Sequence, residues 1–238
     1  MTTILLSFLL LLSPSLSGGG AASAAELLTN EVAIHDAPKW LTAARVNKVV
    51  QKVQRMLEWD IRKVEVRWHS NESEFAAAHG LPVVRDGTAQ ILAVSKKSEN
   101  TIHVGPRVDT TNFDGTFGHE LAHVIVYQKY KTAIPVWLEE GLANYSAKNS
   151  TVDYKYLSTQ PDVDVKAMGH PFGGKGPGPR FHYMASTALM EMIASKCDIH
   201  ELLQLSVGEK LESYLDTFCG ISDLNAEFRR FVKRKAGS

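Results

Sequence analysis

The chain contains only two cysteines, has no excess of charge of either sign, and lacks a long apolar run after its first 25 residues. Its 26 basic residues are matched by 26 acidic ones, so no bulk field draws it to nucleic acid or to anionic lipid. No segment after residue 25 approaches the roughly 20 apolar residues of a transmembrane helix. We therefore expect no nucleic-acid partner and no stable membrane insertion of the mature chain.

The two cysteines, Cys197 and Cys219, both fall in the C-terminal part of the chain. No C-x-x-C pair accompanies them, which argues against zinc ligation by thiolates. In an exported protein they would form one disulfide between two helices, whereas in a cytosolic protein they would be ordinary buried thiols. Spacing alone leaves both alternatives open.

The N-terminus has the pattern of a secretory signal. An apolar run, Ile4 to Leu12, is too short to span a bilayer and is followed by Pro14, three glycines and the small residues Ala21 to Ala25. The absence of Lys and Arg before the run leaves an uncleaved anchor or another exported form open. We expect residues 1–25 to be a signal peptide and residues 26–238 to form a single secreted or periplasmic domain.

The most informative run is HELAH at residues 119–123. On a helix, His119 and His123 lie on the same face and can bind one cation, while Glu120 lies beside it. Glu140 on a second helix would supply an anionic third ligand and leave the fourth position of one Zn²⁺ open to water. Two such histidines without a partner would be costly if buried, which disfavours a purely structural role.

The surrounding pattern supplies the elements that such a site needs. Thr101 to Val104 is typical of a short strand, and Asp114 to Tyr130 has helical spacing with Asp114 as a candidate N-cap. Pro135 suits the start of a further helix, Val136 to Ala147. The expected order is therefore strand, helix with two histidines, turn, helix with the glutamate.

Outside this centre, early strands and late helices predict an α+β domain. Its small N-terminal mixed sheet would carry the metal-binding helix, a helical part would follow, and the metal would lie at their junction. The expected parts are residues 26–112 with helix and sheet, 113–148 with the two zinc helices, and 180–235 with helices. Expected elements are helices Lys39–Asp60 and Glu72–His79, strand Ile61–Trp68, a hairpin of Thr88–Val94 with Thr101–Val104, an irregular segment Tyr154–Phe172, and a flexible connection or lid Gly173–Pro179.

The W-L-x-E-G-x-A run that contains Glu140 carries a family resemblance. Sixteen residues separate His123 from Glu140, and together with HELAH this resembles the gluzincin zinc peptidases, the group of thermolysin and aminopeptidase N. The small, exported "peptidase MA-like" branch is the most similar in length and order of segments. The resemblance implies that Glu140, which precedes the glycine, is the ligand, and not Glu139. It extends from about Ile61 to Val232, but only residues 119–143 are specific.

The resemblance also implies a tyrosine at the start of a later helix, facing the charge that develops in the transition state. Tyr183 matches that place, with His182 as the alternative for the same role, and a partly buried core tyrosine is the structural alternative. Asn144 could orient a ligand imidazole, although thermolysin-like enzymes have an acid in that turn. A solvated or helix-capping asparagine is its alternative.

The substrate is expected to be a peptide or protein. Aminopeptidases of the resembled group carry G-x-M-E-N before the zinc helix, and Thr101 to Arg107 contains nothing similar, which favours an endopeptidase. Glu139 could still reach a substrate amine, or be an exposed helix residue. We expect strand Thr101–Val104 to lie at the sheet edge and bind extended peptide.

We therefore expect a secreted zinc peptidase in which Glu120 is the base and Tyr183 stabilises the oxyanion. A zinc hydrolase of another amide and a catalytically silent zinc-holding protein on the same fold are the alternatives. Glu120 favours an enzyme, because a binding protein needs no base at that position.

Overall fold

The computed structural model describes residues 26–81, 91–149, 151–172, 177–205 and 210–237. The predicted signal peptide, residues 1–25, and most of the glycine-rich connection, residues 173–176, lie outside the described residues. Within the described ranges, no helix combines the length and apolarity that a membrane crossing requires.

The N-terminal half forms a mixed five-stranded sheet in the order β1-β2-β3-β5-β4. The parallel pairs are β2 with β3 and β3 with β5, whereas β1 with β2 and β4 with β5 are antiparallel. The strands are β1 (Leu27–Leu28), β2 (Val32–His35), β3 (Val64–Trp68), β4 (Ala93–Lys96) and β5 (Thr101–Val104). The predicted hairpin is present, with the short 3-10 turn η1 (Lys97–Glu99) between its strands. Its first strand is Ala93–Lys96 rather than Thr88–Val94, and residues 88–90 of that prediction lie outside the described residues.

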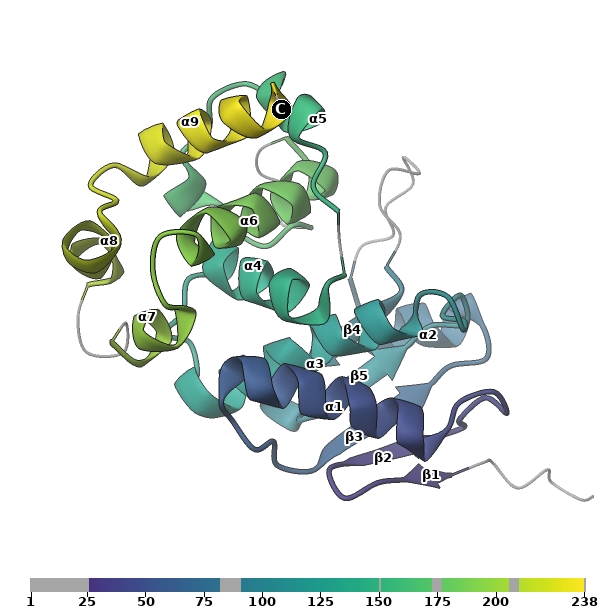
Figure 1. Cartoon of the computed structure of the whole chain (residues 1–238). Helices are drawn as coiled ribbons and strands as arrows, with labels where there is room; N and C mark the ends of the chain where they lie inside the picture. The colour runs from purple at the N-terminus through teal and green to yellow at the C-terminus, as the bar shows by residue number, and fades with distance from the viewer. Residues whose placement is uncertain (1–25, 82–90, 150, 173–176, 206–209, 238) are drawn as a thin grey trace, which may run out of the picture.

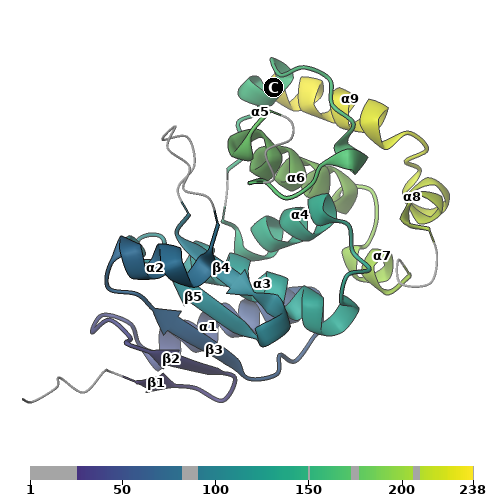
Figure 2. The ribbon, with the colours of Figure 1, turned by 180° about the vertical axis from the view of Figure 1, so that it is seen from behind.

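Helices surround the sheet and fill the C-terminal half. They are α1 (Ala43–Leu57), α2 (Glu72–His79), α3 (Phe113–Tyr130), α4 (Val136–Ala147), α5 (Tyr154–Ser158), α6 (Pro179–Ala194), α7 (Ile199–Leu205), α8 (Leu211–Cys219) and α9 (Leu224–Ala236). Figure 1 shows α3 and α4 in the middle of the molecule. The sheet, α1 and α2 lie on one side of them and helices α5 to α9 on the other, and Figure 2 shows the same arrangement from behind. The predicted α+β class is confirmed.

The hydrophobic core extends through both the sheet part and the helical part of the molecule. Helix α1 buries one stripe, formed by Val46, Val49, Val50, Val53 and Leu57. Helix α3 is buried along most of its surface, so its histidines are placed in the interior rather than on a solvated face. The sequence therefore puts the HELAH helix at the centre of the molecule.

The structure corrects three predicted elements. Thr101–Val104 is not at the sheet edge, because β5 lies between β3 and β4; among the described residues, the edge strand on this side is β4. Asp114 does not cap α3, which begins at Phe113, and its carboxylate instead pairs with Arg45 at 2.6 Å. The segment Tyr154–Phe172 is not irregular throughout, since it contains α5 and the 3-10 turn η2 (Val165–Ala167).

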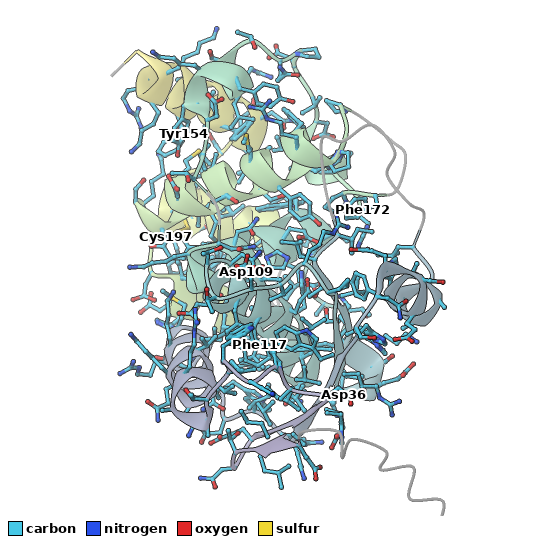
Figure 3. All side chains as sticks on the ribbon, turned by 90° about the vertical axis from the view of Figure 1, so that its right-hand side faces the viewer. Asp36, Asp109, Phe117, Tyr154, Phe172 and Cys197 are labelled. Atoms are coloured by element: carbon cyan, nitrogen blue, oxygen red, sulfur yellow. A yellow bond between two sulfur atoms is a disulfide. The ribbon has the colours of Figure 1, made fainter. Side chains whose placement is uncertain are left out.

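Cys197 and Cys219 form a disulfide, with their Cα atoms 5.0 Å apart. Cys219 ends α8, and Cys197 lies in the turn after α6 on the helical side of the molecule, where it is labelled in Figure 3. The bridge therefore ties the end of α8 to the end of α6, as the disulfide alternative predicted.

Candidate metal centre

Helices α3 and α4 bring the three predicted ligands together. The Nε2 atoms of His119 and His123 lie 3.1 Å apart, because the residues are one turn apart on α3. Glu140 on α4 places Oε2 3.6 Å from Nε2 of His119 and 3.7 Å from Nε2 of His123. All three residues are buried, exposing 6%, 9% and 5% of their surface, respectively.

These separations fit a shared ion. Two donors at ~2.0–2.1 Å from a tetrahedral metal are ~3.3 Å apart, and the three observed distances bracket that value. Oε2 of Glu140 is also buried with no hydrogen-bond partner, which is costly for a carboxylate unless a cation is bound. His119, His123 and Glu140 can therefore hold a metal ion.

A glycine allows the second helix to take this position. A Cβ on Gly141 would lie 2.5 Å from the main-chain oxygen of Ser186 and 3.1 Å from Cβ of Met190, both on α6. Only a residue without a side chain lets α4 approach α6 so closely. This contact fixes the position of α4, and with it Glu140, against α6.

Burial and close charges shift the pKa of each of the three residues, His119, His123 and Glu140, which we call the metal-binding group. Burial and the neighbouring His123 lower the pKa of His119 to about 3. Burial also acts to lower the pKa of His123, but Glu140 and Glu139 outweigh it and raise that pKa to about 9. Burial, with repulsion from Glu120 and Glu139, raises the pKa of Glu140 to about 7. Protons and a metal ion therefore compete for His123 and Glu140.

Glu120 lies beside the metal-binding group and is held by the edge strand. Its Oε2 accepts a hydrogen bond from the main-chain N–H of Ser95 on β4, at 2.8 Å. Burial raises the pKa of Glu120. The side chain remains partly exposed and lines the cleft described below. Its predicted role as a base stays a prediction.

Tyr183, on α6, lies next to the same site. Its ring centroid lies 6.1 Å from that of His119, and it lines the cleft with the metal-binding group. Burial and the carboxylates of Glu140 and Glu120 raise its pKa, so the hydroxyl stays a donor at neutral pH. Tyr183 is among the described residues that line the cleft, whereas His182, the alternative for the same role, is not.

Sequence reasoning missed the role of Glu139. It is not an exposed helix residue: it exposes 6% of its surface, and its Oε1 lies 2.9 Å from Nδ1 of His123. Lys97 from η1 donates to both of its oxygens, at 2.6 and 2.8 Å. The only sequence signal was the position directly before Glu140; Lys97 lies between the two strands of the predicted hairpin, and no role was predicted for it.

Asn144 is likewise not solvated. It exposes 2% of its surface one turn beyond Glu140, and its Nδ2, like Nδ1 of His119, is buried with no hydrogen-bond partner. Its main-chain oxygen accepts from Asn149, so it also helps to end α4. Its predicted influence on His119 stays a prediction.

The metal-binding group forms the floor of a cleft of about 440 Å³. Leu92 and Val94 line it from the β4 side, and Val136 and Phe172 from the helical side. The Phe172 ring, labelled in Figure 3, lies 6.1 Å from that of Tyr183. The cleft thus combines apolar walls with a charged floor, as ligand sites commonly do.

No family model, curated protein or solved structure matches this chain. The chemistry of the site must therefore be argued from its own residues.

Proposed function

We propose that the protein is an exported zinc-dependent peptidase of the gluzincin type that cleaves within peptide or protein chains. One observation carries the proposal. Glu120 is held beside two imidazoles and a carboxylate, one of whose oxygens is buried without a hydrogen-bond partner. A site that only held a metal would not need this additional carboxylate.

Zinc is the ion that the donor set favours. Two imidazoles and one carboxylate are a frequent catalytic zinc set, with one position left for water or substrate. When bound, Zn²⁺ would lower the pKa of its water to about 7 and polarise the scissile carbonyl. His119, His123 and Glu140 would hold this single ion.

The chain itself supplies the proton transfer and charge stabilisation. Glu120 accepts the proton of the attacking water and delivers it to the leaving amine. The N–H of Ser95 holds one oxygen of Glu120, which leaves the other for the proton. Tyr183 donates its hydroxyl to the negative charge that develops on the substrate oxygen, where a fixed donor is most effective.

Two observations support cleavage within a chain. Glu139 is already bound to His123 and Lys97, so it does not offer its carboxylate to a substrate amine. In addition, the main-chain N–H of Gly105 donates to the oxygen of Leu92. Because hydrogen-bonded and non-hydrogen-bonded residue pairs alternate along antiparallel strands, this bond determines which residues of β4 bond to β5. The main-chain groups of Ala93 therefore point away from β5, and an extended substrate can pair with this edge.

Export is proposed from the N-terminal pattern of residues 1–25 and from the Cys197–Cys219 bridge. Disulfides persist mainly in secreted and periplasmic proteins. Cleavage of the signal would release the domain into that compartment.

The decisive test compares the wild type with Glu120→Gln on a denatured protein and a peptide library. We expect both proteins to bind one Zn²⁺, and the variant to lose roughly 10²–10⁴-fold in kcat/KM, the range for a lost general base. Glu212→Gln, at an exposed position on α8, is the matched control and should behave as wild type. Zinc binding without any cleavage that Glu120→Gln abolishes would favour the zinc-holding binding protein.

A further inference from the structure

We propose that Lys97 is a positioning residue of the metal centre. Acting through Glu139, it fixes the imidazole of His123 and thereby sets the metal affinity. This rests on the metal-binding part of the proposed function and does not depend on peptide hydrolysis.

A continuous chain of hydrogen bonds joins Lys97 to His123. The Lys97 ammonium donates to both oxygens of Glu139, and Oε1 of Glu139 accepts from Nδ1 of His123 at 2.9 Å. With its proton held at Nδ1, the ring offers the lone pair of Nε2, which faces His119 and Glu140. Ligand histidines are commonly held by a carboxylate in this way, which fixes both tautomer and ring orientation.

Lys97 also balances negative charge at the metal centre. Glu120, Glu139 and Glu140 bring three carboxylates to one largely buried region. A divalent ion and one ammonium balance them, and Lys97 is the ammonium that contacts a carboxylate there. Without Lys97, Glu139 would lose two of its three described side-chain hydrogen bonds and would no longer be held in one orientation.

The position of Lys97 in the fold links it to the proposed base as well. It begins η1, the turn of the β4–β5 hairpin, two residues after Ser95. The hairpin thus holds Glu120 through a main-chain N–H and His123 through Lys97 and Glu139. One strand turn therefore positions both the proposed base and a proposed ligand.

The experiment measures Zn²⁺ affinity of the full chain, stripped with a chelator and titrated against a chromophoric competitor. We expect Lys97→Met to bind Zn²⁺ about tenfold more weakly, the lower end of the effect of lost outer-shell partners. Lys97→Arg can still donate two bonds to a carboxylate and should stay within about threefold of wild type. Lys96→Met, at the neighbouring strand position paired with Thr101, is the control and should bind as wild type.

A double-mutant cycle separates positioning from a general effect on the fold. If Lys97 acts through Glu139, the combined variant Lys97→Met with Glu139→Gln should bind Zn²⁺ as Glu139→Gln alone does. Lys97→Met leaves the buried carboxylate of Glu139 without its ammonium partner, so its melting temperature without metal should fall, and zinc affinities are compared at a temperature where every variant is folded.

The outcomes are distinguishable. Equal or tighter zinc binding by Lys97→Met would overturn this inference, since tighter binding would mean that Lys97 acts only as a repelling charge. Additive effects in the double variant would overturn it as well. A wild type that binds no zinc would overturn both this inference and the proposed function, whereas tight binding without peptide cleavage would overturn only the latter.

Discussion

Metal affinity should depend steeply on pH, because protons and the ion compete for the same atoms. In the metal-free protein, Glu140 and Glu139 raise the pKa of His123 to about 9, and burial raises that of Glu140 to about 7. Both must be deprotonated to bind the ion. His119, with a pKa lowered to about 3, is already neutral.

The size of the effect follows from proton linkage. With those two pKa values, binding releases about one proton at pH 8 and about two at pH 6, so affinity should fall about a thousandfold between them. Two histidines and a glutamate with ordinary pKa values would give less than about twentyfold. Because the pKa values of His123 and Glu140 are both raised, lowering the pH favours the metal-free state.

Calorimetric zinc titrations in buffers of different ionisation enthalpy count the released protons directly. A fall in affinity of less than about twentyfold from pH 8 to pH 6 would refute the reasoning. Glu139→Gln is an internal check, because it removes one of the charges that raise the pKa of His123 and should make the dependence shallower between pH 7 and pH 9.

Three further predictions follow from packing and from the site. Gly141→Ala should cost about 1–3 kcal/mol in urea unfolding, because its Cβ would meet the Ser186 oxygen at 2.5 Å, whereas Gly169→Ala has no atom within 4 Å and serves as control; equal stability of the two would contradict the close α4–α6 contact. Tyr183→Phe should lower kcat about 10²-fold with little change in KM, and a change confined to KM would show a binding role instead. Reducing the Cys197–Cys219 bridge, which spans 22 residues, should remove about 3 kcal/mol of unfolding free energy, and an unchanged denaturation midpoint would argue against it.

The elements that the sequence predicted best depend on local spacing. Helices Glu72–His79 and Val136–Ala147 have the predicted bounds, and the two histidines lie on one face because helical geometry leaves no alternative. The start of α3 was wrong because Asp114 finds a stronger partner in Arg45, 69 residues away in the chain. Local capping preferences do not include such a partner.

The HELAH motif by itself predicted two of the three residues that can hold a metal ion. His119 and His123 are one helical turn apart, and the family resemblance indicated Glu140, rather than Glu139, as the third ligand. Only the tertiary structure decided how that site is supported. The order of strands placed β4 rather than β5 at the edge, and thereby brought Ser95 and Lys97 to Glu120 and Glu139. Lys97 and Glu139 are 42 residues apart, and no local spacing predicts a contact that depends on how a sheet packs against two helices.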